Sequence, residues 1–106
     1  MKPLFAPEAA EDMENIYSYY AEYNENYAVE LYNHIIEEAE LLRCFPYKAP
    51  REQLLEENPE EYRSLIIRHS YKLVYFVEND TINVVAVFDC RQNPEKLKEY
   101  IRKIKR

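Results

Sequence analysis

Three short runs of β-branched and aromatic residues between residues 62 and 91 constrain the fold of this chain more than any other feature. The runs are Tyr62–Arg68, Tyr71–Glu78 and Thr81–Phe88, and short polar breaks separate them. Runs of this length and composition are typical of strands in an antiparallel meander. Asn79 and Asp80 tolerate the left-handed backbone of a two-residue hairpin, so the second break predicts a tight turn although the chain contains no glycine. The three runs therefore predict a small antiparallel sheet.

Two amphipathic helices are expected in the residues that precede this sheet. The first begins at Pro7, whose fixed φ suits the first helical turn, and it is expected to end near Asn24. The second follows a short polar connector, and its apolar side chains recur at three- and four-residue steps: Ala28, Leu31, Tyr32, Ile35, Ala39 and Leu42. Because the connector is short, the helices must be antiparallel neighbours. Each has one apolar stripe, so the pair must cover one face of the sheet.

Shorter segments complete the predicted fold. Lys2–Ala6 predicts a fourth strand beside the meander, with Pro3 at its start or on an edge because proline cannot donate to a ladder. Asn93, Pro94 and Glu95 are typical of the start of a helix, here one of about three turns. The predicted fold class is α+β with two layers: an N-terminal strand, an antiparallel helical hairpin, a three-stranded meander and a C-terminal helix.

The length and composition of the chain fit one domain, residues 1–106, with a single modest core. No apolar run approaches the roughly 18 residues that a membrane span needs, and the start lacks the apolar segment of a signal peptide, so we expect a cytoplasmic protein. Cys44 and Cys90 lie far apart and are expected to be free thiols. No residues show metal-ligand spacing and no glycine-rich phosphate loop is possible, so neither a metal nor a cofactor is predicted.

The charge is distributed unevenly along the chain. Residues 1–61 contain 4 Lys or Arg and 15 Asp or Glu, a balance of −11, whereas residues 62–106 contain 10 and 5, a balance of +5. Such polarity lets one surface meet a charged partner while the opposite surface stays solvated. The alternative is that both halves are simply soluble.

The order of these elements, together with several short motifs, resembles the RelE/ParE superfamily of toxins from type II toxin–antitoxin systems, and in particular its ParE-like, plasmid-stabilisation branch. The motifs are Phe5–Asp12, Tyr62–Leu65, Tyr71–Tyr75 and Val87–Leu97. The similarity covers nearly the whole chain. It implies a small bacterial protein that a disordered antitoxin segment holds inactive and that arrests growth once freed.

The superfamily divides into two mechanisms. RelE-like members are ribosome-dependent ribonucleases that cut mRNA, and ParE-like members inhibit DNA gyrase. A nuclease would use a cluster of cations, for which the candidates are Arg63, Lys72 and Arg91. However, Lys72 stands where many nucleases carry arginine, and a net charge of −6 suits ribosomal RNA poorly. We therefore favour gyrase inhibition, with an mRNA interferase as the alternative and catalysis expected only in that case. A decayed toxin that still binds an antitoxin is the third hypothesis.

Contacts with an antitoxin or a target are expected at Arg63, Arg68, Arg91 and Tyr100, with cationic side chains gathered on or beside the sheet face opposite the helical hairpin. Structural roles are open for two of them, since Arg91 could pair with Asp89 or Glu95, and Tyr100 lies in an apolar stripe. Four tyrosines of the predicted hairpin could line a groove for an antitoxin helix or a dimer mate: Tyr17, Tyr20, Tyr23 and Tyr27. The expected assembly is a homodimer or a toxin–antitoxin hetero-oligomer.

Overall fold

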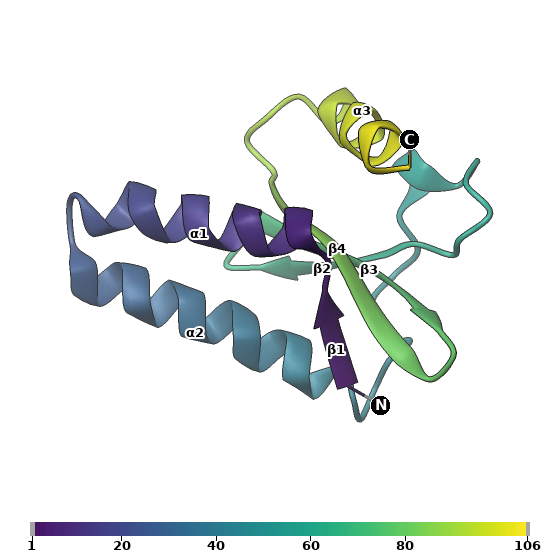
Figure 1. Cartoon of the computed structure of the whole chain (residues 1–106), viewed down its shortest axis with the longest axis horizontal. Helices are drawn as coiled ribbons and strands as arrows, with labels where there is room; N and C mark the ends of the chain where they lie inside the picture. Colours follow the sequence, from purple (N-terminus) through teal and green to yellow (C-terminus); the bar gives the residue numbers. More distant parts are fainter. Residues whose placement is uncertain (1, 106) are drawn as a thin grey trace.

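The computed structural model describes residues 2–105, and its elements follow the predicted order. They are β1 (Lys2–Phe5), α1 (Pro7–Ala21), α2 (Glu25–Leu41), a short 3-10 helix η1 (Gln53–Leu55), β2 (Arg63–Ile67), β3 (Tyr71–Glu78), β4 (Thr81–Asp89) and α3 (Glu95–Ile104). Figure 1 shows α1 and α2 running side by side, with the sheet next to them and α3 set apart from the pair. The predicted α+β class, the helical hairpin and the meander are confirmed.

The four strands form one mixed sheet in the order β1-β4-β3-β2. The meander strands pair antiparallel, whereas β1 pairs parallel with β4 and places Lys2 opposite Thr81. Pro3 therefore lies on an edge strand, where a missing backbone donor is tolerated. The register of β3 and β4 shifts because Val74 aligns with Ala86 but Tyr75 aligns with Val84. The extra residue between them is a β-bulge, which turns consecutive side chains toward the same face.

The two tight turns of the meander are made without glycine. Asn79 and Asp80 have φ values of 53° and 57°, the left-handed pair predicted for this hairpin. Arg68 and His69 have φ values of 52° and 60°, so they form the turn between β2 and β3. The prediction that Arg68 lies on a strand is therefore wrong, because this turn also needs two consecutive left-handed residues.

Two details of the helical hairpin differ from the prediction. Asn24 was expected to end the first helix, but that helix ends at Ala21 and Asn24 caps the second one: its side chain accepts a hydrogen bond of 3.1 Å from the backbone N–H of Tyr27. Tyr32 was expected in the buried stripe of α2, but its side chain is 36% exposed. It lies at the edge of that stripe, where its ring meets the ring of Tyr17 edge-on at 6.2 Å between centroids.

Apolar clusters cover both faces of the sheet. The hairpin buries residues such as Met13, Leu31 and Ile35 against the face that includes Leu73, Tyr75, Ile82 and Val84. On the opposite face, Leu55, Leu97 and Ile101 from η1 and α3 pack against Val74, Val85, Ala86 and Phe88. The bulge explains why the neighbours Val85 and Ala86 share this cluster. The second face is thus largely a core, which corrects the expectation that cationic side chains gather there.

Candidate functional site

The three cations proposed for a nuclease do not form one cluster. Arg63 and Lys72 lie on opposite faces of the sheet, because residues two positions apart on a strand share a face. Arg63 shares the hairpin-facing side with Leu65 and Ile67, whereas Lys72 shares the opposite side with Val74 of the second cluster. Arg91 follows the end of β4, whereas Arg63 pairs with Tyr75 farther along the sheet. Each of the three has its own carboxylate partner.

Arg63 fastens a loop to the start of β2. Its guanidinium donates hydrogen bonds to the carbonyl of Ala49 at 2.7 Å and the carbonyl of Tyr47 at 3.3 Å, and it pairs with Glu61 at 2.8 Å. The guanidinium also lies 5.2 Å from the centre of the Tyr47 ring. The side chain is only 17% exposed. These contacts give Arg63 a structural role, supported by the Tyr75 hydroxyl, which donates to the Pro46 carbonyl at 2.7 Å.

Lys72 is held by a buried carboxylate. Its ammonium group lies 2.6 Å from Glu52, which is 7% exposed as a residue. Glu52 also accepts hydrogen bonds from the Ser64 hydroxyl at 2.8 Å and the Leu54 N–H at 3.1 Å. Burial raises the pKa of Glu52, but the hydrogen bonds from Lys72, Leu54 and Ser64 outweigh burial and the pKa lies below its ordinary value. Lys72 is thus engaged inside the protein.

Arg91 is more open. Its guanidinium donates two hydrogen bonds of 2.9 Å to Asp89, yet its side chain is 59% exposed. These bonds hold the pKa of Asp89 below its ordinary value. The same guanidinium lies 3.4 Å from the hydroxyl of Tyr20 and 3.3 Å from that of Tyr71. Tyr71 donates to Tyr20 at 3.1 Å, and this bond, with Arg91, lowers the pKa of Tyr20. The sequence offered Asp89 and Glu95 as ion-pair partners of Arg91, and the structure shows the pair with Asp89.

Arg68 lies at the same end of the sheet as Arg91. The two turns are joined by a hydrogen bond of 2.8 Å from the Cys90 N–H to the Ser70 carbonyl. Arg68 donates to the Nδ1 atom of His34 at 2.9 Å, and its guanidinium lies 5.6 Å from the centre of the Tyr27 ring.

We call this region the tyrosine–arginine end, and it consists of Tyr19, Tyr20, Tyr23, Tyr27, Arg68, Tyr71 and Arg91. Its aromatic rings contact one another edge-on, for example Tyr20 with Tyr27 at 5.1 Å between centroids. Tyr19 and Tyr23 are largely exposed, Tyr23 to 75%. Tyrosine and arginine are among the residue types that contribute most to binding energy at protein interfaces.

The sequence predicted part of this region. Arg68, Arg91 and three of the hairpin tyrosines were expected at a contact surface, whereas Tyr19 and Tyr71 were not. The four-residue spacing of Tyr19 and Tyr23 within the first helix as predicted, which was expected to end near Asn24, could have revealed the first of these. The partnership of Tyr71 with Tyr20 joins β3 to α1 and leaves no local signal.

Tyr100 joins α3 to α1. Its hydroxyl donates to the Asp12 carboxylate at 3.0 Å and lies 3.1 Å from the Glu8 carbonyl, and burial raises its pKa. Asp12 also accepts the N–H of Val87 at 3.0 Å, and its own pKa is raised by burial despite these bonds. These contacts give Tyr100 a structural position, half-buried between the two helices.

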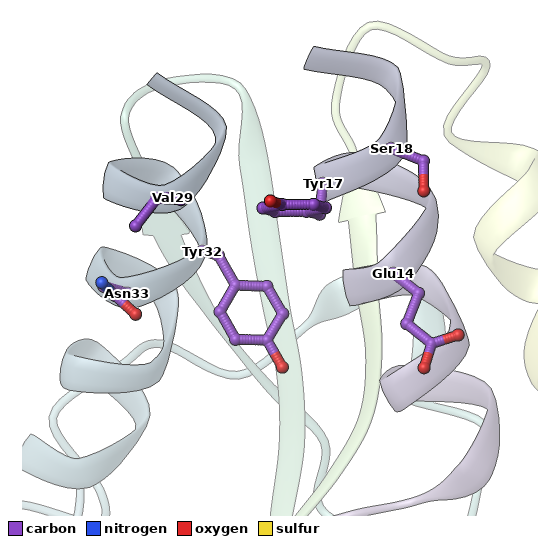
Figure 2. Close-up of a pocket in the computed structure, with 6 residues that line it drawn as sticks. All are labelled: Glu14, Tyr17, Ser18, Val29, Tyr32 and Asn33. Atoms are coloured by element: carbon purple, nitrogen blue, oxygen red, sulfur yellow. The ribbon is translucent and has the colours of Figure 1, made fainter. Parts of the chain in front are cut away.

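An apolar groove lies between α1 and α2. It has a volume of about 390 Å³ and is lined by Glu14, Tyr17, Ser18, Val29, Tyr32 and Asn33. Figure 2 shows the rings of Tyr17 and Tyr32 between the two helices, with the polar residues on either side. Of the four tyrosines expected to line a groove, only Tyr17 does so here, while the other three belong to the tyrosine–arginine end.

The described part of the chain, residues 2–105, contains no group of three His, Cys, Asp or Glu side chains that could hold a metal ion. None of its helices is long and apolar enough to span a membrane. Both cysteines are free thiols, as predicted.

The fold and this site define a small α+β protein with tyrosine and arginine side chains exposed at one end of its sheet. A family model described as the ParE toxin of the type II toxin–antitoxin system parDE matches residues 4–94, and the chain belongs to this family. The predicted resemblance and the assignment as a type II toxin are confirmed.

Comparison with solved structures supports the same fold. A chain described as "Chromosomal ParDE TA system from P. aeruginosa" is similar, with a TM-score of 0.69 and 21% sequence identity. The match covers 84% of this chain and 95% of that one. A comparison with curated protein sequences yields no significant match.

Proposed function

We propose that this toxin arrests bacterial growth by inhibiting DNA gyrase in the cytoplasm, and that a cognate antitoxin protein neutralises it. Membership of the ParE family supports the target. The similar chain described as part of a ParDE toxin–antitoxin system supports an antitoxin partner.

The main observation that argues against an mRNA interferase is the separation of Arg63, Lys72 and Arg91. Cleavage of RNA by its 2′-hydroxyl needs a group that takes the proton and cations that together stabilise the phosphorane. In this protein the three cations lie on different surfaces, and each is bonded to a carboxylate within 2.9 Å. A phosphate group could not contact them together.

The tyrosine–arginine end is the surface that we assign to the target. Arg91 and Arg68 are exposed there, beside tyrosines that supply large contact areas at little entropic cost. Arg63 and Tyr100 were proposed for the same role, but their internal bonds make them supports of the fold, so we expect them to affect binding through stability.

The test compares two arginine variants of the purified protein. Arg91→Ala should weaken inhibition of gyrase supercoiling by about tenfold or more, the effect of losing one interface hot spot. Arg43→Ala is the matched control, because Arg43 is also an exposed arginine with one carboxylate partner, Glu40 at 3.5 Å. It should inhibit as the wild type does. Circular dichroism should show both variants folded.

Two outcomes would contradict the proposal. Cut transcripts in a translating extract with unchanged supercoiling would favour the mRNA interferase. Harmless accumulation after expression without any antitoxin would favour a decayed toxin.

A further inference from the structure

Residues 41–51, which connect α2 to η1, combine exposed aromatic side chains with cations, and we call them the aromatic–basic loop. The segment contains no Asp or Glu and three cations: Arg43, Lys48 and Arg51. Leu41, Phe45 and Tyr47 are exposed, the two rings to 64% and 59%. Large apolar side chains that are exposed close together, with polar groups around them, indicate an interaction site.

The sheet holds the backbone of this loop in place. Arg63 and Tyr75 donate the hydrogen bonds described above to three of its carbonyls, and the N–H of Ser64 donates to a fourth, that of Pro50, at 3.1 Å. A loop that is already fixed loses little conformational freedom when it binds a partner. The exposed side chains are therefore presented on a preorganised support.

The ring of Tyr47 has one covered face and one open face. The guanidinium of Arg63 lies over the ring, 5.2 Å from its centre, yet the tyrosine is largely exposed. A planar group of a partner could therefore stack on the open face of a ring whose position is fixed from behind. Phe45 supplies a second exposed ring two residues earlier in the chain.

The cations of the loop are available to an anionic partner. Within residues 2–105, Lys48 and Arg51 make no ion pair, and Arg43 makes one exposed pair, at 3.5 Å. Two acidic side chains that follow the loop in the chain, Glu52 and Glu61, are already paired with cations of the sheet. The loop thus offers positive charge beside its aromatic rings.

We propose that the aromatic–basic loop binds single-stranded nucleic acid. Bases would stack on Phe45 and Tyr47, while Arg43, Lys48 and Arg51 would contact the phosphates. Stacking on aromatic rings and contact of cations with the backbone are the interactions by which proteins hold single strands without reading their sequence.

Two other anionic partners fit the loop less well. A bilayer surface is flat, so the exposed carboxylates of Glu37 and Glu40 near the end of α2 would approach it together with the loop and would be repelled by anionic lipids. A DNA duplex keeps its bases stacked inside the helix, so it leaves the rings of Phe45 and Tyr47 without a partner. A single strand is narrow enough to follow the three cations, and its bases are free to stack.

The loop and the tyrosine–arginine end lie at opposite ends of α2. Tyr27 is in the first turn of this helix, whereas the loop begins at its last residue, Leu41 (Figure 1). A helix of 17 residues is about 25 Å long, so the two surfaces can act independently. The inference requires neither the gyrase target nor growth arrest, and it stands or fails separately from the supercoiling and expression experiments.

The probes are fluorescently labelled single strands of DNA and of RNA with one shared sequence of about 12 nucleotides, within the usual site size of such proteins. Fluorescence anisotropy measures their binding to the whole chain. Each strand should bind at least about tenfold more tightly than the duplex, and binding should weaken as salt is added. DNA and RNA should bind within about threefold of each other, because stacking and phosphate contacts do not involve the 2′-hydroxyl.

The first variant tests stacking. Phe45→Ala should weaken binding of both strands by about tenfold, the effect of losing one stacked base. Phe45 is exposed enough to be replaced without loss of fold, which circular dichroism checks. Tyr23→Ala is the matched control, because it removes an aromatic ring of similar exposure from the other end of the hairpin. It should bind as the wild type does.

A pair of double variants separates the loop from overall charge. Lys48→Glu with Arg51→Glu changes the loop, while Lys96→Glu with Arg102→Glu makes the same change of charge at two exposed residues of α3. Only the first pair should abolish binding.

Several outcomes would overturn the proposal. They are equal effects of the two double variants, unchanged binding by Phe45→Ala, and a preference of more than about tenfold for one sugar. Binding of the duplex as tight as that of the strands, or sedimentation with anionic vesicles in place of strand binding, would overturn it too.

Discussion

Arg63 and Arg91 make similar contacts, yet they lie in two regions of the molecule that differ in how exposed the arginine side chain is. Each pairs with an acidic residue two positions earlier, Glu61 or Asp89, and each lies against a tyrosine ring. Around Arg63 the region is closed, because the guanidinium bonds to loop carbonyls and the side chain is largely buried. Around Arg91 the hydrogen bonds go to side chains, and most of the arginine remains exposed.

The comparison teaches that the identity of a cation and its partner does not reveal its role. The two arginines differ in whether backbone carbonyls lie within reach. The carbonyls of Tyr47 and Ala49, in the loop beside Arg63, accept hydrogen bonds from its guanidinium. Lys72 belongs to the closed region as well, since it is bonded to buried Glu52. Four experiments would break or sharpen this contrast.

The largest effect is expected at Lys72. Lys72→Met should lower the free energy of unfolding by about 3 kcal/mol, because it leaves Glu52 as a buried carboxylate without its cation. Urea denaturation followed by circular dichroism measures the change. Adding Glu52→Gln should restore part of the loss. Lys98→Met is the control, since Lys98 makes a more exposed pair with Glu95 at 3.5 Å and should lose less than about 1 kcal/mol.

A smaller loss is expected at Arg63. Arg63→Ala should lower the free energy of unfolding by about 2 kcal/mol, since the carbonyls of Ala49 and Tyr47 lose a charged donor in a partly buried place. The same urea titration applies, with Arg43→Ala as the exposed counterpart. A loss no larger than that of Arg43→Ala would mean that the region around Arg63 is not closed in solution.

The pH dependence of stability tests Glu52 directly. Its folded-state pKa lies below the ordinary value of 4.5, so its contribution is fully present above that value and is lost as the pH falls through the folded pKa. The difference in unfolding free energy between the wild type and Glu52→Gln should therefore shrink as the pH is lowered from about 6 to about 3. A difference that is constant over this range would rule out the shift.

The smallest change in stability is expected at Arg91. Arg91→Ala should alter the free energy of unfolding by less than about 1 kcal/mol, because exposed ion pairs contribute little. Growth arrest after induction, scored by colony counts against the Arg43→Ala strain, should nevertheless be strongly reduced. If Arg91→Ala instead destabilises the protein as much as Arg63→Ala does, the contrast between the two regions disappears.

The sequence predicted the structural features that depend on residues close together in the chain. The meander, the turn at Asn79 and Asp80, and the cap at Asn93, whose side chain accepts the N–H of Glu95 at 3.0 Å, all have local signals. Asn24 was recognised as a helix boundary but assigned to the wrong helix, because asparagine suits both kinds of end.

The placement of the cations could not be predicted in this way. Arg63 and Lys72 are engaged by Ala49 and Glu52, which belong to an irregular segment whose path over the sheet is set by tertiary packing. The turn at Arg68 lacks the Asn, Asp or Gly that usually marks left-handed backbone, so its strand assignment followed from composition alone. The charge asymmetry, in contrast, was visible in the sequence. It is found again in the helical hairpin, because residues 7–42, which include both helices, contain ten acidic residues and no Lys or Arg.

The parallel pairing of β1 with β4 bears on how the toxin comes into being on the ribosome. β1 is synthesised long before its partner strand, which ends at Asp89. The sheet thus closes only after β4 has been synthesised, because contacts between distant segments must wait for the later one. The surface around Arg91 needs α1 and β3 as well. A product truncated before residue 89 therefore lacks the finished surface around Arg91, and we expect it to be non-toxic.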